Sequence, residues 1–322
     1  PEGKLKEGEM INDFSADDLR RLMHRMVFTR IFDTRAVSLA KQGRLGFYAP
    51  VAGQEATMVG SVDAMEDADW LIPSYRDLPQ LIFRGYPLEQ AFLFSRGHQG
   101  GFAIPEGVRA LGPQIIIGAQ IVQAAGIALG LKLRQDEGVA VAFIGDGGTS
   151  QGDFYEGLNT AAVYDAPLIV IVQNNGYAIS VPVSEQTKAK TLAQKAIAFG
   201  IPGRRIDGMD VLAVVRAVRE ALKLARGGAG PVLIEAVMYR YGPHTMSGDD
   251  PTRYREAREL SEWEQRDPLL RFRTFLTEQG LWDEKKEKEV IEESKEAIAQ
   301  ALAKAEAAPK MTVETLVASV YR

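Results

Sequence analysis

The chain has 322 residues, 46% of them hydrophobic, so it can bury a large core and is longer than the commonest single domain. A formal net charge of −5 excludes the basic surface of a nucleic-acid-binding protein, and the lack of cysteine excludes disulfides, thiolate catalysis and cysteine-bound metals. The sequence has neither an apolar run long enough for a membrane span nor a secretory pattern at its N-terminus. Composition therefore favours a cytoplasmic protein that binds neither nucleic acid nor membrane.

The first predicted element is a long helix near the N-terminus. Residues 1–14 are polar and are interpreted as a lead-in. Ser15 followed by Asp18 has the pattern of a capping box, and apolar residues then recur at helical spacing to about Gln42. Further along, residues 115–133 form a run of small and apolar residues that predicts another helix. A helix of this kind packs closely against a neighbour, either within this chain or across a subunit interface.

A β-α-β unit follows and carries the most informative residues of the chain. Residues 139–144 are continuously apolar, which predicts a strand buried on both faces. This strand ends at Gly145-Asp146-Gly147, and after a helix a second apolar run, residues 168–172, ends at Asn174-Asn175. Because the two strands of such a unit lie parallel, both polar ends should meet at one edge of the sheet. Open α/β sheets bind their ligands at that edge.

The residue types at these two ends suit a metal that holds a diphosphate. Asp146 offers a charged oxygen, an asparagine offers a neutral one, and Mg²⁺ takes such ligands together with phosphate and water. Gly147 and Gly148 leave room for a phosphate, and the next helix points its N–H groups at the anion. A tight turn with a helix cap is the ordinary alternative for each half alone. Two such halves around one β-α-β unit favour the metal site.

The remaining chain continues this alternation and ends in helices. The predicted elements are a loop at 176–183, a helix to Phe199, a short strand at Ile206, a helix at 210–226, a strand at 231–239, a polar loop at 242–254 and helices from Glu256, with a solvated charged run at 283–307. The sequence thus predicts an α/β fold with a doubly wound, mainly parallel sheet, an N-terminal helix and a C-terminal helical tail. The predicted division is 1–44, 45–255 and 256–322.

Residues 145–180 resemble the thiamine diphosphate motif of the 2-oxoacid dehydrogenases, and the spacing from Asp146 to Asn175 suits that motif. The similarity begins near residue 16 and extends to the C-terminus. Segment 239–250 is most similar to enzymes that act on pyruvate, while subunits for branched-chain 2-oxoacids or acetoin are closely similar. Other segments resemble the α subunit of the E1 component of this family, namely 43–48, 53–56, 75–77 and 117–120.

The resemblance implies a thiamine diphosphate-binding fold with Mg²⁺ as the second cofactor. It assigns the metal to the side chains of Asp146 and Asn175 and the main-chain carbonyl of Tyr177. Tyr75 and Arg76 would reach the diphosphate. The other cofactor contacts that it implies are Ile115 and Ile117 at the aminopyrimidine, Gly145, Gly147 and Gly148, Ile179, and His244 on a mobile loop.

The chain has three histidines, and two are catalytic candidates. His244, in the polar loop, is interpreted as a proton donor or a contact of the diphosphate or the reacting group. His98 is the second candidate, although Gly100 stands where close bacterial relatives carry another histidine. His24, on the first helix, is interpreted as a surface or packing residue. Ser247 matches the position that is phosphorylated in mitochondrial relatives.

The implied reaction is oxidative decarboxylation of a 2-oxoacid, with transfer of the acyl group to lipoamide. In this family the glutamate that activates the cofactor lies on a separate pyrimidine-binding domain, and the residues after 256 read as helices. The expected partners are therefore an E1 β subunit, in an α₂β₂ heterotetramer, and the lipoyl domain of an E2 acyltransferase.

Two other classes of protein are alternatives to this family. A nucleotide-binding enzyme fails because the glycines of residues 145–152 do not form G-x-G-x-x-G and the chain has no phosphate-binding loop of the G-x-x-x-x-G-K-[ST] type. A non-catalytic scaffold subunit could keep the fold and lose the chemistry. The intact Asp146, Asn175 and His244 argue against it.

Overall fold

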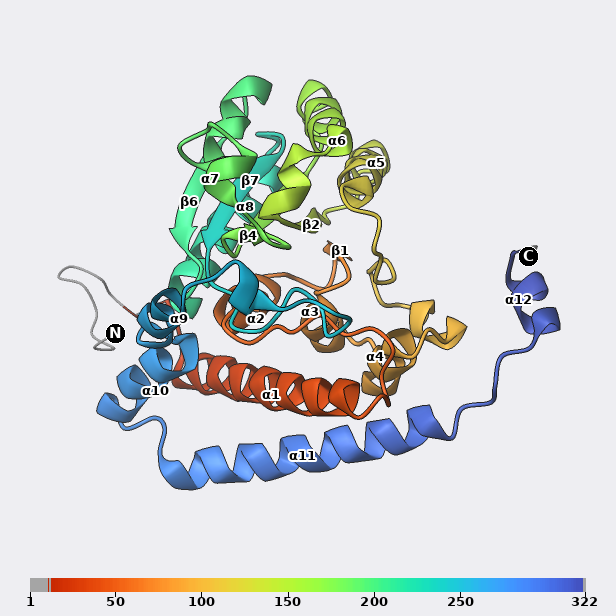
Figure 1. The fold of residues 1–322 in the computed structure, drawn as a ribbon. Coiled ribbons are helices and arrows are strands. Elements are labelled where there is room, and N and C mark those ends of the chain that lie inside the picture. Colours follow the sequence, from red (N-terminus) through yellow and green to blue (C-terminus); the bar gives the residue numbers. More distant parts are fainter. Residues whose placement is uncertain (1–10, 12, 321–322) are drawn as a thin grey trace.

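The structure is a computed structural model that describes residue 11 and residues 13–320, so the predicted lead-in falls mostly outside the described part. Its centre is a five-stranded parallel sheet with the strand order β1-β2-β3-β7-β6 (Figure 1). These strands are β1 (Trp70–Ile72), β2 (Ala140–Gly145), β3 (Leu168–Asn174), β6 (Gly203–Asp207) and β7 (Val232–Val237), and a small antiparallel hairpin joins β4 (Tyr177–Ala178) to β5 (Val181–Pro182).

Helices cover both faces of this sheet. The N-terminal helix α1 packs on the long C-terminal helix α11, which runs beneath the body in Figure 1. The α-helices are α1 (Ala16–Lys41), α2 (Glu55–Asp63), α3 (Leu78–Phe83), α4 (Leu88–Ser95), α5 (Ala119–Leu133), α6 (Gly152–Val163), α7 (Val183–Gln186), α8 (Val211–Arg226), α9 (Ala257–Glu264), α10 (Pro268–Glu278), α11 (Glu284–Glu306) and α12 (Val313–Val320). The 3₁₀ helices are η1 (Gln99–Phe102), η2 (Asp146–Ser150), η3 (Leu192–Phe199) and η4 (Pro251–Arg253).

Strand β2 shows why the sheet needs two apolar layers. Val141 and Phe143 point into the core that contains α1, α2 and α8, while Ala142 and Ile144 point into the core that contains α5 and α6. All four side chains are fully buried. A strand covered on both faces has no side chains facing water, so its residues are apolar in succession and do not alternate with polar ones. The prediction of a doubly wound parallel α/β fold is confirmed.

The predicted β-α-β unit is β2, α6 and β3, which are neighbours in the sheet and lie parallel. The register pairs Gly145 with Gln173, so the residues that follow the two strands leave the sheet at the same edge. The capping box is also confirmed, because Ser15 Oγ accepts from Asp18 N (3.1 Å) and the Asp18 carboxylate accepts from Ser15 N (3.0 Å).

Two predicted helices have the wrong extent. The helix expected from Ile115 begins only at Ala119, because Gly118 adopts a φ of 97° that a helix cannot continue through. Residues 115–117 are therefore an exposed loop. The helix expected to reach Phe199 is two short pieces, α7 and η3, because Thr187 and Thr191 both take extended backbone, which suits β-branched side chains.

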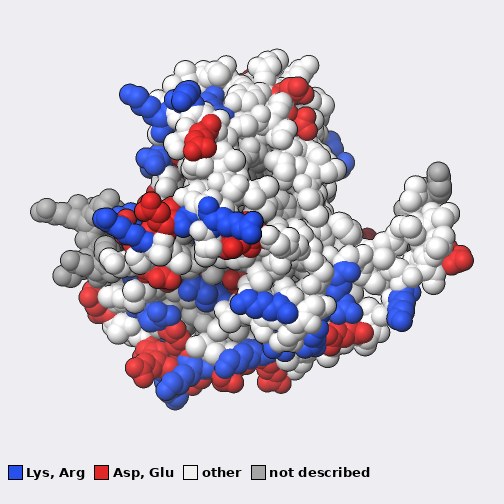
Figure 2. Space-filling model, in the orientation of Figure 1, with Lys and Arg blue, Asp and Glu red and all other residues white. Residues whose placement is uncertain are grey.

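Charges are distributed unevenly over the surface. Figure 2 shows charged side chains gathered along α11, as predicted for a solvated charged run. Of the helices that the structure describes, none is both long enough and apolar enough to cross a membrane.

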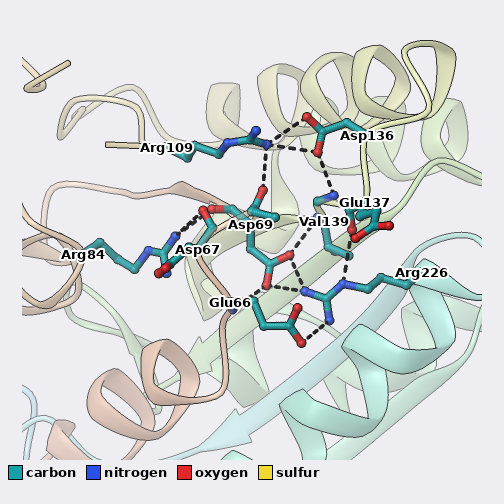
Figure 3. Close-up of polar contacts among 11 residues, drawn as sticks. Glu66, Asp67, Asp69, Arg84, Arg109, Asp136, Glu137, Val139 and Arg226 are labelled. Atoms are coloured by element: carbon teal, nitrogen blue, oxygen red, sulfur yellow. Dashed lines mark hydrogen bonds and ion pairs between the residues drawn. The ribbon is translucent and has the colours of Figure 1, made fainter. Parts of the chain in front are cut away.

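Ion pairs hold the amino-terminal edge of the sheet, opposite the edge just described (Figure 3). Asp69, immediately before β1, is fully buried, and its two carboxylate oxygens accept from Arg226 Nη2 at 2.7 and 2.8 Å. The same carboxylate accepts from the backbone N–H groups of Glu66 (2.8 Å) and Val139 (2.9 Å). One side chain thus joins β1, the start of β2 and the end of α8.

Replacing Asp69 with alanine is expected to lower the free energy of unfolding by about 3 kcal/mol, because removing one partner of a buried ion pair costs about 3–5 kcal/mol and Arg226 keeps some solvent contact. Urea unfolding measures the change. Glu66→Ala is the matched control, because Glu66 reaches the same Arg226 from an exposed position and its loss should cost less than about 1 kcal/mol. Equal losses in the two variants would contradict this account of the network.

Candidate active site

A cavity of about 390 Å³ lies at the carboxyl edge of the sheet. It brings together every predicted site residue except His98. The predicted residues in its wall are Tyr75, Arg76, Ile115, Ile117, Gly145, Asp146, Gly147, Gly148, Asn175, Tyr177, Ile179 and His244, and the other wall residues are Phe47, Ser74, Gln120, Ile144, Gln151, Gln173, Ala178 and Thr245.

Asp146 is the acidic group of this wall. It directly follows β2, and its side chain is 1% exposed. Its Oδ2 atom is buried without a hydrogen-bond partner among residues 11 and 13–320. Burial raises the pKa of Asp146 to about 6, and the backbone hydrogen bonds and the nearby Arg240 offset only part of that rise. A buried carboxylate oxygen left free in this way is suited to a cation.

Asn175 lies in the same cavity wall as Asp146 and can offer its amide oxygen. Its Nδ2 donates to Gln54 Oε1 (3.2 Å), which leaves Oδ1 as the acceptor, and Oδ1 takes only a long contact from Tyr177 N (3.4 Å). Tyr177 is itself anchored, because its hydroxyl donates to Glu259 Oε2 at 2.7 Å. Gln54 supports the structure at this point. It does so by orienting a predicted ligand, and its place in segment 53–56 was the available signal.

These donors fit a hard divalent cation. Within the part of the chain that the structure describes, no cluster of three or more His, Cys, Asp or Glu side chains suits a metal. The cavity instead offers one carboxylate, one amide oxygen and the carbonyls near Tyr177. Such a set holds Mg²⁺ weakly by itself and leaves positions for phosphate oxygens and water.

The glycines of the turn have two different reasons to lack a side chain. A Cβ on Gly145 would meet no atom within 4 Å, so this residue leaves open space at the cavity wall. A Cβ on Gly147 would lie 2.7 Å from Ala178 Cβ, and one on Gly148 would collide with the side chain of Ile144. Close packing therefore requires glycine at 147 and 148, in addition to the predicted approach of a phosphate.

Arg76 connects two loops at the cavity. It is buried, and its Nη1 donates to Pro50 O (2.6 Å) while its Nη2 donates to His244 O (2.9 Å). The same Nη2 lies 3.3 Å from His244 Nδ1, and the Tyr75 ring meets the His244 ring edge-on with centroids 5.9 Å apart. A fixed guanidinium in the wall can present its remaining N–H groups to an anion.

His244 is neutral at pH 7. Burial, together with the positive charges of Arg76 and Arg240, lowers its pKa to about 4. Because a guanidinium only donates, Nδ1 is the acceptor in the contact with Arg76, and the proton of the neutral ring resides on Nε2. Asp249 holds the backbone of this loop by accepting from His244 N, and it also accepts from the Tyr254 hydroxyl at 2.7 Å.

The ring of His244 is expected to stay neutral down to about pH 4. The unfolded chain protonates this histidine near pH 6.5, so the contribution of His244 to the free energy of unfolding should fall as the pH drops from about 6.5 to about 4. NMR of ring-labelled histidine measures the titration, and the His244→Asn spectrum assigns one signal among three. A His244 signal that titrates near pH 6.5 would contradict the burial of the ring.

Sequence reasoning assigned no role to Arg240, although it lies in the segment 239–250 that carried the resemblance. The structure buries it completely, and burial lowers its pKa to about 10. Its Nη2 donates to Ile179 O (3.2 Å), its Nη1 donates to Gly242 O (3.1 Å), and the guanidinium lies 3.9 Å from Asp249. Arg240 thus connects the loop that carries His244 to the β4–β5 hairpin, which begins at the predicted metal ligand Tyr177.

His98 lies outside the cavity. Its Nδ1 accepts from Gly100 N (3.0 Å), and its Nε2 is 3.0 Å from Pro309 O in the segment that leads to α12. His24 is a surface residue 3.7 Å from Glu293, in keeping with its interpretation from the sequence. Ser247 is exposed and donates to Gly46 O (3.2 Å). A role for Ser247 as a phosphorylation site stays a prediction.

Comparison with known proteins decides the family. The family model described as "Dehydrogenase E1 component" matches residues 23–314 of this chain. The chain belongs to the dehydrogenase E1 component family. This is a thiamine diphosphate-dependent family, so the family predicted from residues 145–180 is confirmed.

Curated members of the E1 component family are similar to this chain over nearly all of its length. A Staphylococcus aureus protein named pyruvate dehydrogenase E1 component subunit alpha is 57% identical over 319 residues, which cover 99% of this chain and 86% of that protein. Proteins of the same name from Bacillus subtilis and Bacillus cereus are 57% identical over 321 residues, again covering 86% of their length. These relatives all carry the name of the α subunit.

Proposed function

We propose that this chain is the α subunit of a pyruvate dehydrogenase E1 component. With a β subunit it catalyses the oxidative decarboxylation of pyruvate and transfers the acetyl group to the lipoyl group of an E2 acyltransferase. The observation that carries the proposal is the buried Oδ2 of Asp146, which has no partner among the residues that the structure describes, in a cavity that also contains Asn175, Arg76 and His244. The names of relatives that are 57% identical support pyruvate as the substrate.

The chain would hold thiamine diphosphate through Mg²⁺. Asp146, Asn175 and the carbonyl of Tyr177 would bind the metal, and the fork of Arg76 would donate to the phosphate oxygens. Tyr75 and the backbone at Gly147 would complete the diphosphate contacts. When bound, the cofactor supplies the carbon nucleophile and the electron sink for decarboxylation.

The other end of the cavity would receive the organic part of the cofactor and the substrate. Ile115, Ile117 and Ile179 offer apolar surface for an aromatic ring. His244, neutral with its proton on Nε2, would donate a hydrogen bond near the reacting oxo group. His98 is 3.0 Å from Pro309 O and outside the cavity wall, so any role in catalysis would require movement of the loop that carries it.

The rim of the cavity favours completion by a partner chain. Ile115 is 53%, Ile116 is 72% and Ile179 is 53% exposed. Exposed apolar side chains around a ligand site mark a surface that another protein covers. We infer that the E1 β subunit, within an α₂β₂ heterotetramer, closes this rim and that the lipoyl domain of E2 reaches the site through the complex.

The test is transfer of the acyl group to an isolated lipoyl domain by this chain co-expressed with an E1 β subunit. Pyruvate, 2-oxoisovalerate and acetoin are compared, each with Mg²⁺ and thiamine diphosphate or with EDTA. The proposal expects acetyl transfer from pyruvate that requires both cofactors, and none from this chain without its partner. Preference for 2-oxoisovalerate or acetoin would overturn the substrate, and failure of every substrate would indicate a scaffold subunit.

A further inference from the structure

Lys195 lies on η3, behind the turn that carries Asp146, and is not part of the cavity wall. Its Nζ donates to Thr149 O (2.7 Å), to Thr149 Oγ1 (3.1 Å) and to the Tyr155 hydroxyl (2.9 Å). An ammonium group has three protons, so these three acceptors satisfy it completely. The cation also sits near the faces of two aromatic rings, 5.2 Å from the centroid of Tyr155 and 5.8 Å from that of Phe154.

A chain of hydrogen bonds leads from this lysine to the candidate metal ligand. Thr149 is fully buried, and its Oγ1, which accepts from Lys195, donates to the carbonyl of Asp146 (2.8 Å). Asp146 opens the η2 turn and Thr149 lies within it, so Lys195 holds this turn from outside the cavity wall. The contact spans two elements that are far apart in the chain, η2 and η3.

This support matters because of the state of Asp146. An oxygen of the buried Asp146 carboxylate has no hydrogen-bond partner among the described residues. The free energy of the folded protein would therefore fall if the turn relaxed and let this oxygen accept from a donor or from water. The bonds from Lys195 to both polar atoms of Thr149 oppose that relaxation and keep the carboxylate edge aimed at the cavity. Groups that orient a metal ligand in this way are worth about 10- to 100-fold in metal affinity.

We propose that Lys195, acting through Thr149, is a positioning residue for the metal ligand Asp146. This inference rests on the proposed function, because it assumes that Asp146 binds Mg²⁺ together with thiamine diphosphate. Lys195 touches neither the cavity nor the metal in this arrangement. Its effect should therefore appear as a weaker affinity for Mg²⁺, and not as a loss of the binding site.

The experiment is calorimetric titration of thiamine diphosphate into the complex with the E1 β subunit, at a series of Mg²⁺ concentrations. Lys195→Met should need about tenfold more Mg²⁺ for half-maximal cofactor binding, with unchanged thiamine diphosphate affinity once Mg²⁺ saturates. Lys195→Arg, which can still donate to Thr149, should restore most of the affinity. Lys188→Met, an exposed lysine of the preceding segment, is the matched control and should behave like the parent.

Thr149→Val is the second variant, and it removes the hydroxyl link while Lys195 remains. It should also raise the Mg²⁺ requirement. If the parent binds the cofactor with Mg²⁺ and both Lys195→Met and Thr149→Val match it, the positioning role is overturned while the proposed function stands. If the parent shows no Mg²⁺-dependent binding, the proposed function fails first and this inference fails with it. Equal weakening in Lys188→Met would show a general effect of charge and would also overturn the inference.

Discussion

Asp146→Asn is expected to remove Mg²⁺-dependent binding of thiamine diphosphate while the protein stays folded. The substitution keeps the shape of the side chain and deletes the charge of the buried oxygens. Affinity should fall by more than about 100-fold, because even the groups that merely orient a ligand are worth about 10- to 100-fold. Calorimetric titration of the complex with its β subunit measures the loss.

Asp146→Asn should also change how the free energy of unfolding depends on pH. The pKa of Asp146 is raised to about 6 in the folded protein, so its contribution to stability is present at low pH and is lost as the pH rises through about 6. Without metal, Asp146→Asn should therefore be at least as stable as the parent at pH 8. Asp153→Asn, an acidic residue on the adjacent helix α6, is the control and should retain the cofactor. If Asp146→Asn retained the cofactor as well as the parent does, the metal assignment would be wrong.

Arg76→Met should weaken thiamine diphosphate binding by about 10- to 100-fold even when Mg²⁺ saturates, because charge-assisted hydrogen bonds contribute about 1.5–3 kcal/mol each. The variant also loses the bonds to Pro50 O and His244 O that connect two loops. Hydrogen exchange should therefore become faster at His244 and Thr245. Calorimetry and exchange mass spectrometry measure the two effects separately.

Arg76→Lys separates charge from geometry. Lysine keeps the positive charge and lacks the planar fork, so it should recover part of the affinity but not the slow exchange of the loop that carries His244. Unchanged cofactor binding in Arg76→Met would remove Arg76 from the diphosphate site, and unchanged exchange would show that the loop is held by Arg240 and Asp249 instead.

The sheet and the core of the site could be predicted because both rest on local patterns. A strand buried on both faces has a continuous apolar run, as β2 does and as β3 does from Leu168 to Val172. The parallel β-α-β connection then places the residues after both strands at one edge, which is how Asp146 and Asn175 came to be expected together. The resemblance added residues distant in the chain, such as Tyr75 and His244, which spacing alone does not connect.

The parts that could not be predicted depend on contacts between distant segments. Gln54 orients Asn175, and Lys195 supports the turn of Asp146, but neither pair has a periodic signal in the sequence. Arg240 is charged and yet completely buried, which its residue type does not suggest. The start of α5 depends on the conformation of Gly118, and composition alone does not distinguish a glycine inside a helix from one that precedes it.

The proposed function depends on thiamine diphosphate being held through Mg²⁺ at Asp146. The most direct measurement is a calorimetric titration of thiamine diphosphate into the chain co-purified with its E1 β subunit, once with Mg²⁺ and once with EDTA. We expect saturable binding with Mg²⁺ and none with EDTA. Binding that is equal in both, or absent from both, would contradict it.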